Sequence, residues 1–530
     1  MRTLLATLAL VLAGASPALA ADPAFERSLP GNASAARVGA APDTWLVGAR
    51  PGRAASALAR RAGARLIAPE AGGGYVVARG RARGFAAALR RRGLLLYAQP
   101  DRYRRLDRVQ DDPLSGPPND WRAVVADPSL DPPVVSPTSP LIALVDARID
   151  ETHPEWTGDP FVSTLGGRPL DNLHGTATAS VAAAPANHIG ILGVWPGARA
   201  LNVPLPDRIT CSASAGAIAK AIRAGAAVIN MSYGSARACA PEYVALQDAV
   251  ARGIVPVAAA GNEFDAGNPP EFPASLPHVL TVAAVNAKLN SSAFSNANDA
   301  VDLSAPGEGI ETAVPPTLDD DGTPDGYERL DGTSFSAPMV SAAVAWIRAA
   351  RPTLAADQAA QVVRLSAHDL GPKGWDRDTG YGLLNVGKAL KARAPRHDPL
   401  EPNDNIVWVD GRALGAPSTP IYRGKGATRL KALLDAYEDP RDVYRVRIPG
   451  HGRARVTVNP SFGNPALLAY APTATSVASH RIATSHRKGA ATERVTLRNR
   501  SRKARTFYVA VGIQAGARTL DCAYTLTTQR

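Results

Sequence analysis

The sequence predicts an α/β protein in three parts: a doubly wound parallel sheet, preceded by a small α+β domain and followed by an all-β sandwich. The length, 530 residues, exceeds one ordinary domain. The hydrophobic fraction, 45%, is ample for packed cores. In the middle of the chain, unbroken apolar segments alternate with Ala-rich helical ones, as is typical of strands buried on both faces of a parallel sheet.

Residues 1–20 have the composition of a secretory signal. Arg2 is followed by an apolar run that ends in Ala18-Leu19-Ala20, so we expect cleavage after Ala20. The run is too short for a membrane anchor, and no later segment is long and apolar enough to cross a bilayer. The expected product is secreted, extracellular or periplasmic, with no membrane partner.

Residues 21–111 form the first predicted domain. Its expected elements are strands at 44–48, 74–79 and 94–99 and helices at 54–63 and 83–92. This order suggests a small α+β fold of the split βαβ type. A charged and then Pro/Gly-rich linker follows it.

Residues 112–395 form the second predicted domain, with the parallel sheet. Its expected elements are strands at 141–145, 226–230, 254–260 and 278–285 and helices at 174–184, 214–224 and 244–252. Ligand sites in such sheets gather at the carboxyl ends of the strands.

Residues 400–530 form the third predicted domain, and the whole region after Pro395 is expected to be all-β. Its alternating segments are 442–448, 453–459, 493–499 and 506–512. They are separated by turn residues, which predicts a compact β-sandwich.

The net charge of +12 is divided unevenly along the chain. It is +10 over residues 21–111, −11 over 112–395 and +12 over 396–530. A nucleic-acid-binding protein would carry a basic stripe on its working domain, so nucleic acid is not expected as a partner. The division reflects either an arginine-rich genome or docking of the first domain on the second by opposite charge.

Three cysteines are present, and export permits a disulfide. Cys211 with Cys239 is the favoured pair because both fall in the second predicted domain, which leaves Cys522 as a thiol. The other two pairings remain open from the sequence.

Three polar residues stand at predicted element ends. Asp146 closes a strand, while His174 and Ser334 each open a helix. A serine hydroxyl becomes a nucleophile when an imidazole removes its proton, and a buried carboxylate orients that imidazole. Backbone N–H groups at the start of a helix and the side-chain amide of Asn262 can stabilise a developing oxyanion.

These residues stand in motifs that resemble the subtilisin-like (subtilase) family over roughly residues 112–392. The order Asp, His, Ser is the order of that family. The motifs are IALVDARIDETHPEW, DNLHGTATASVAAA, INMSYGS, VAAAGNE, EFPAS, DGTSFSAP and GYGLLNV.

The resemblance implies a subtilisin-like fold and a serine endopeptidase that acts on polypeptides through an acyl-enzyme, with no catalytic cofactor. Asp146, His174 and Ser334 would form the triad, and Asn262 would supply the oxyanion amide. The substrate backbone would pair with an edge strand made of Ser232, Tyr233 and Gly234.

The sequence departs from the family pattern at two places. Ala147-Arg148 follow the aspartate, where the family usually has Ser/Thr-Gly, and Ala177 replaces a second histidine. Because Arg148 could over-stabilise the Asp146 carboxylate, the alternative is a catalytically dead protease scaffold that acts as a secreted binding protein. A lipase or esterase is disfavoured because no G-x-S-x-G motif surrounds Ser334.

The EFPAS segment lies, by resemblance, at the primary specificity pocket. Glu271 then stands where the family often has a small neutral residue, which predicts a preference for Arg or Lys before the scissile bond. The alternative is a solvated carboxylate that points outward.

Subtilases commonly bind calcium in the loop after the histidine helix. By resemblance, Asn187, Glu155 and the carbonyls of Pro185, Ile189 and Ile191 would form an oxygen cage for a structural ion. The acidic segment 318–328 is a second candidate, better explained as a solvated insertion.

The flanking domains also resemble known modules. Residues 21–111 resemble the inhibitory propeptide of the family, which implies a self-processed zymogen whose own propeptide is its inhibitor. Residues 400–530 resemble the bacterial pre-peptidase C-terminal domain. The protein is expected to be a monomer.

Overall fold

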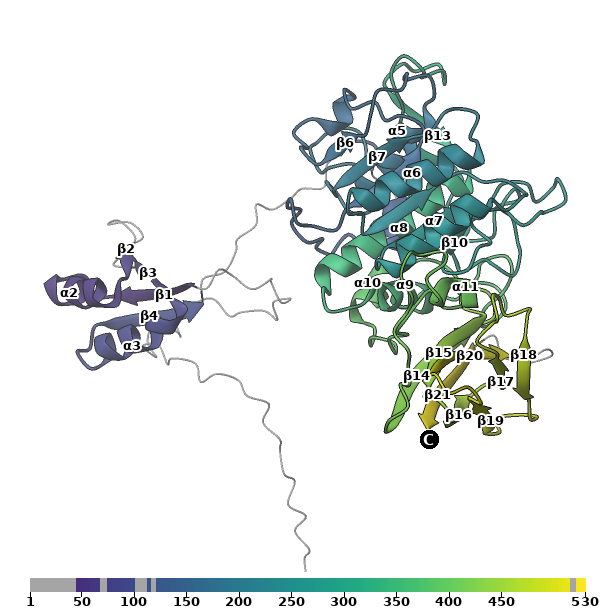
Figure 1. Cartoon of the computed structure of the whole chain (residues 1–530). Coiled ribbons are helices and arrows are strands. Elements are labelled where there is room, and N and C mark those ends of the chain that lie inside the picture. Colours follow the sequence, from purple (N-terminus) through teal and green to yellow (C-terminus); the bar gives the residue numbers. More distant parts are fainter. Residues whose placement is uncertain (1–43, 67–73, 101–111, 116–120, 515–520) are drawn as a thin grey trace, which may run out of the picture. The chain divides into compact units, whose positions relative to one another are not determined.

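The structure is a computed structural model that describes residues 44–66, 74–100, 112–115, 121–514 and 521–530 (Figure 1). The predicted signal at residues 1–20 lies outside this range. Two compact units, Met1–Val109 and Gln110–Arg530, are described separately.

The first unit has the expected order of elements, β-α-β-β-α-β. They are β1 (Thr44–Ala49), α2 (Arg53–Ala62), β2 (Arg65–Leu66), β3 (Gly74–Ala78), α3 (Arg79–Arg90) and β4 (Leu95–Pro100). The strands form an antiparallel sheet in the order β2-β3-β1-β4. Helix α3 packs on this sheet through Phe85 and Leu89, which are buried with Val47 and Tyr75.

The second unit begins with an α/β domain built on a seven-stranded sheet in the order β11-β10-β9-β8-β5-β7-β6. The strands are β5 (Ile142–Asp146), β6 (Val162–Thr164), β7 (Ala200–Pro204), β8 (Val228–Met231), β9 (Val255–Ala259), β10 (Leu280–Val285) and β11 (Leu303–Pro306). All neighbouring strands are parallel, so the predicted parallel sheet is confirmed.

Helices cover both faces of this sheet. They are α4 (Trp121–Val125), α5 (His174–Ala183), α6 (Cys211–Arg223), α7 (Ala240–Ala251), α8 (Thr333–Ala350), α9 (Ala356–Leu365) and α10 (Val386–Lys391), with a 3-10 turn at Pro154–Trp156. A hairpin of β12 (Ile310–Ala313) and β13 (Tyr327–Leu330) lies outside the main sheet.

Side chains of β5 alternate between the two faces of the sheet. Ile142 and Leu144 pack with residues of α5 and α8, whereas Ala143 and Val145 pack with residues of α6 and α7. All four side chains are fully buried. A strand of this kind needs apolar residues at every position, which is why the unbroken apolar segments predicted it.

The chain ends in a β-sandwich of two antiparallel four-stranded sheets, β14-β21-β16-β19 and β15-β20-β17-β18. The strands are β14 (Ala427–Asp435), β15 (Arg441–Ile448), β16 (Arg453–Phe462), β17 (Pro465–Tyr470), β18 (Arg481–Ser485), β19 (Glu493–Arg498), β20 (Arg505–Ile513) and β21 (Asp521–Gln529). The expectation of an all-β region is wrong in one respect, because Ile406–Val409 forms the short helix α11.

The sandwich contacts the α/β domain through buried charges. Arg364 of α9 pairs with Asp302 before β11 and with Asp435 at the end of β14. His278, just before β10, pairs with Asp404 of the segment that leads into the sandwich. Among the described helices, none has the length and apolar character needed to cross a membrane.

Candidate active site

The site forms where β5, β8 and β9 end and helices α5 and α8 begin. Asp146 is the last residue of β5, and His174 is the first residue of α5. His174 Nδ1 lies 2.7 Å from Asp146 Oδ1. The Asp146 side chain is 4% exposed and the His174 side chain 29%, so the carboxylate is buried and the imidazole is partly accessible to solvent.

Neighbouring donors fix the Asp146 carboxylate. The backbone N–H of Ala147 donates to Oδ1 at 2.7 Å, and the hydroxyl of Thr178, one turn along α5, donates to Oδ2 at 3.0 Å. Burial disfavours the charged form of His174, but the charge of Asp146 and the hydrogen bond to it outweigh burial, so the pKa of His174 is raised above its ordinary value. The imidazole is therefore prepared to accept a proton.

Ser334 is the second residue of α8. Its hydroxyl donates to the carbonyl oxygen of Ser232 at 3.3 Å, and the hydroxyl of Ser232 donates to the carbonyl of Ser334 at 2.8 Å. The ring of Phe335 lies 5.9 Å from the His174 ring, which places the start of α8 beside the imidazole. Within the described residues His174 and Ser334 share no hydrogen bond, and such catalytic bonds commonly tighten only when substrate is bound.

Asn262 follows β9 and is held by Thr333. Its Oδ1 accepts two hydrogen bonds from Thr333, one from the backbone N–H and one from the hydroxyl, both at 2.9 Å. Oδ1 already accepts these two bonds. The amide nitrogen lies near Gly332 and can donate to another group. The N–H of Ser334 lies in the first turn of α8, where backbone donors have no intrahelical acceptor. Together these two groups can bind a developing oxyanion.

The segment predicted to bind substrate backbone follows β8. Gly234 is exposed, and its neighbour Ser235 forms an antiparallel bridge with Phe272. The phenol of Tyr233 turns inward and donates to Glu242 at 3.2 Å. The segment is therefore anchored by its own side chain while its backbone stays accessible at Gly234.

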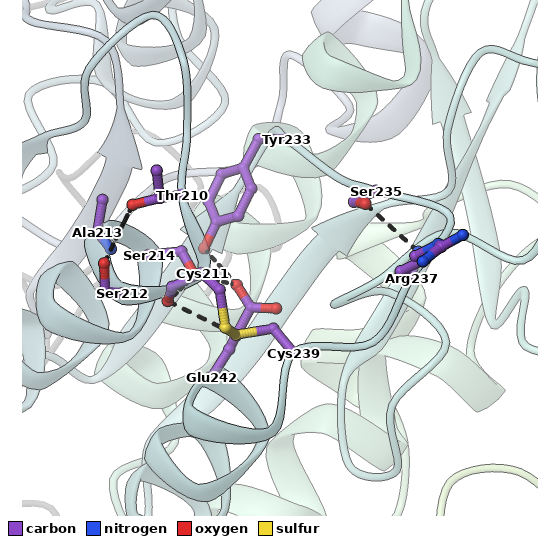
Figure 2. The surroundings of a disulfide bond; sticks show 10 residues. All are labelled: Thr210, Cys211, Ser212, Ala213, Ser214, Tyr233, Ser235, Arg237, Cys239 and Glu242. Atoms are coloured by element: carbon purple, nitrogen blue, oxygen red, sulfur yellow. Dashed lines mark hydrogen bonds between the residues drawn. A yellow bond between two sulfur atoms is a disulfide. The ribbon is translucent and has the colours of Figure 1, made fainter.

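A disulfide braces the same region (Figure 2). Cys211 at the start of α6 is bonded to Cys239 just before α7, so the favoured pairing is confirmed. The hydroxyl of Ser214 on α6 donates to Glu242 on α7, the carboxylate that also holds Tyr233. Cys522 lies buried in the sandwich, where its thiol donates to the carbonyl of Phe462.

Glu271 lies directly against the substrate-binding segment. It is 7% exposed, so it is not the solvated, outward-pointing carboxylate of the alternative interpretation. A Cβ added at Gly234 would overlap with its carboxylate. Burial, and then the charge of Glu263, raise the pKa of Glu271 to about 7.

Arg148 does not reach the catalytic carboxylate. Its guanidinium donates to the carbonyl oxygen of Arg168 at 2.6 Å. The position that departs from the family pattern therefore leaves the hydrogen bonds of Asp146 intact. Ala177, the other departure, is fully buried inside α5.

The structure brings the predicted calcium ligands Glu155 and Asn187 together, and most of their polar atoms form hydrogen bonds within the protein. Asn187 donates through its amide nitrogen to the carbonyl of Glu155 at 2.8 Å and accepts at Oδ1 from Ile189 N–H. Glu155 Oε2 accepts from the hydroxyl of Tyr327 and from Ile191 N–H. Burial raises the pKa of Glu155 to about 8. Glu155 Oε1 has no hydrogen-bond partner within the described residues, and calcium binding by this loop stays a prediction.

Sequence reasoning missed Thr178, Thr333 and Glu242. Thr178 stands four residues after His174 and Thr333 directly before Ser334, so helical spacing could have pointed to both. Nothing in the sequence connects Glu242 with Tyr233 before α6 and α7 are packed together.

Comparison with known proteins identifies the family of this chain. The sequence profile of the subtilase family matches residues 138–382. The chain is 33% identical over 259 residues to subtilisin from Bacillus pumilus, covering 47% of this chain and 90% of that protein. It is 29% identical over 325 residues to fervidolysin from Fervidobacterium pennivorans, covering 53% of this chain and 45% of fervidolysin.

The crystal structure of fervidolysin aligns with a TM-score of 0.47 and 18% identity, over 86% of this chain and 84% of that one. The chain spans 45% of fervidolysin and 65% of subtilisin E from Bacillus subtilis, less than two thirds of either relative. From the profile match and the identity to Bacillus subtilisins, this chain belongs to the subtilase family.

Proposed function

We propose that this protein is a secreted serine endopeptidase that cleaves peptide bonds through an acyl-enzyme at Ser334. The observation that carries the proposal is the 2.7 Å hydrogen bond between His174 and Asp146, formed beside the start of the helix that bears Ser334. Catalysis needs no cofactor, because the imidazole serves as both general base and general acid.

The reaction follows from the positions of these groups. Nδ1–H of His174 donates to Asp146, which leaves Nε2 to take the proton of the Ser334 hydroxyl as the oxygen attacks the substrate carbonyl. The oxyanion is stabilised by the amide of Asn262 and the N–H of Ser334. The imidazolium then gives its proton to the leaving amine, and water hydrolyses the acyl-enzyme by the same route.

The substrate is an extended polypeptide that pairs with the backbone from Ser232 to Gly234, and its side chain before the scissile bond is Arg or Lys. The support for this preference is Glu271, a buried carboxylate that touches Gly234 and forms no ion pair within the described ranges. A basic side chain would pair with this carboxylate and offset the cost of its burial.

The protein is made as a zymogen, with the α+β unit as its own inhibitor. The support is the charge of +10 over residues 21–111 against −11 over 112–395. Secretion is supported by the apolar start of the chain and by the Cys211–Cys239 disulfide, a bond that oxidising compartments allow.

The test is Ser334→Ala in the full chain, with Ser336→Ala as a matched control. Ser336 lies two residues further along α8, and its hydroxyl donates to the carbonyls of Ala305 and Pro306. We expect Ser334→Ala to abolish peptide hydrolysis, fluorophosphonate labelling and N-terminal processing, and Ser336→Ala to keep all three. Fluorophosphonate labelling that persists in Ser334→Ala rejects the proposal. If the parent chain neither reacts with the fluorophosphonate nor cleaves peptides, the protein is the catalytically dead scaffold of the alternative.

A further inference from the structure

A buried carboxylate on α7 contacts the proposed substrate-binding segment through a tyrosine. Glu242 lies in the first turn of α7 and is 3% exposed. The hydroxyl of Tyr233 donates to its Oε1 at 3.2 Å (Figure 2). Because Tyr233 stands between Ser232 and Gly234, this bond joins α7 to the backbone that would pair with a peptide.

Two helices fix the position of Glu242. The hydroxyl of Ser214 on α6 donates to the same oxygen, Oε1, at 2.5 Å. Ser214 and Glu242 each follow one cysteine of the Cys211–Cys239 disulfide by three positions (Figure 2). Residues three positions apart at the start of a helix lie close together. The disulfide therefore holds the starts of α6 and α7, and with them these two side chains, beside each other.

The substrate-binding segment has one anchor on each side of Tyr233. Before it, the hydroxyl of Ser232 donates to the carbonyl of Ser334 at 2.8 Å. After it, Ser235 exchanges two backbone hydrogen bonds with Phe272, both of 2.9 Å. Between these anchors, Tyr233 packs its ring against the apolar cluster beneath α6 and α7. The hydrogen bond to the α7 carboxylate fixes that ring and limits movement of the middle of the segment.

We propose that Glu242 is a positioning residue that acts through the Tyr233 hydroxyl. It holds the backbone of Tyr233 and Gly234 in the conformation that pairs with an extended substrate. This inference rests on the proposed peptidase function. Without the carboxylate, binding has to order a looser segment, and the cost of that ordering appears in KM. The groups that carry out the chemistry are unchanged, so kcat stays near its parent value.

The place of the segment makes the effect depend on substrate length. Ser232 contacts Ser334, so the substrate residue next to the scissile bond lies beside Ser232. In an antiparallel pair, the second and third residues before the scissile bond then lie beside Tyr233 and Gly234. A substrate with one residue before the scissile bond does not reach the part of the segment that Glu242 positions.

The test measures kcat and KM for a p-nitroanilide with four residues before the scissile bond, and kcat/KM for one with a single residue. Both substrates carry the same residue next to the bond, chosen from the preference of the parent. The variants are Glu242→Ala, Tyr233→Phe, the two combined, and Glu242→Gln, whose amide oxygen can still accept from the tyrosine. Asp248→Ala is the matched control, because Asp248 lies six positions further along α7 and pairs with Arg252 at a more exposed site.

We expect Glu242→Ala and Tyr233→Phe each to raise KM for the longer substrate about 2- to 10-fold at nearly constant kcat, the range set by the loss of one hydrogen bond. The double variant should be no worse than either single variant, because both changes remove the same contact. Glu242→Ala should leave kcat/KM for the single-residue substrate near the parent value. Glu242→Gln should restore most of the lost affinity, and Asp248→Ala should match the parent.

Three results would overturn the positioning role. One is an equal loss with both substrates in Glu242→Ala, which would indicate general structural damage. Another is additive effects in the double variant. The third is an unchanged KM in Tyr233→Phe, which also decides the matter if Glu242→Ala does not fold. Fluorophosphonate labelling of the parent tests the proposed function separately: with a labelled parent these results reject the positioning role alone, and an unlabelled parent rejects both.

Discussion

Replacing Glu271 with glutamine removes one charge at the proposed specificity pocket and keeps the shape of the side chain. Glu271 is 7% exposed, and the pKa of its carboxyl is raised from 4.5 to about 7. In the empty pocket, that shift disfavours the ionised form of Glu271 relative to the protonated form by at most about 3 kcal/mol. A bound arginine can offset this penalty by pairing with the carboxylate. The preference for arginine over a neutral isostere is therefore limited to about 100-fold in kcat/KM.

The assay is the ratio of kcat/KM for two peptides that differ only in arginine or citrulline before the scissile bond. Because His174 acts on both peptides, its titration changes both kcat/KM values equally and leaves their ratio unchanged. Because the raised pKa keeps Glu271 neutral at low pH, the preference for arginine should grow as the pH rises through about 7. Glu271→Gln should reduce the ratio by up to about 100-fold and make it independent of pH.

Asp265→Asn is the matched control, since it makes the same charge change at an exposed position of the loop after Asn262. It should leave the ratio unchanged. An equal ratio in the parent and in Glu271→Gln, or a parent that prefers large apolar residues, would refute the reasoning.

The remaining predictions concern three further residues or pairs. Asn262→Ala should lower kcat by about 10²–10³ with little change in KM, because the amide acts on the oxyanion, and a rise in KM at constant kcat would contradict this. Replacing both Cys211 and Cys239 with serine should lower the free energy of unfolding in urea by about 3–4 kcal/mol for a separation of 28 residues, and an unchanged midpoint would argue against that. Tyr327→Phe should cost about 1–3 kcal/mol in thermal unfolding, since the buried Glu155 carboxyl loses its hydroxyl donor and keeps only the Ile191 N–H; full stability would show that the hydroxyl contributes nothing.

The sequence predicted the triad because each member stands at the end of an element with a clear local pattern. The apolar run before Asp146 and the Ala-rich helices after His174 and Ser334 define those ends without knowledge of the tertiary fold. Helix α11 was missed because IVWV is too short to show a helical period.

Contacts between distant segments could not be predicted in the same way. Tyr327 meets Glu155 only after the β12–β13 hairpin folds over the loop, and Thr333 meets Asn262 only after α8 packs beside β9. The burial of Glu271 likewise depends on the bridge between Ser235 and Phe272, which no local pattern encodes.

The overlap between Gly234 and Glu271 restricts how this protein can change its sequence. A Cβ at position 234 would overlap with the Glu271 side chain, so that side chain would have to move away. A larger residue at position 234 therefore displaces the Glu271 carboxylate, unless position 271 becomes smaller first. Libraries that randomise position 234 alone should yield fewer active clones than paired libraries at both positions.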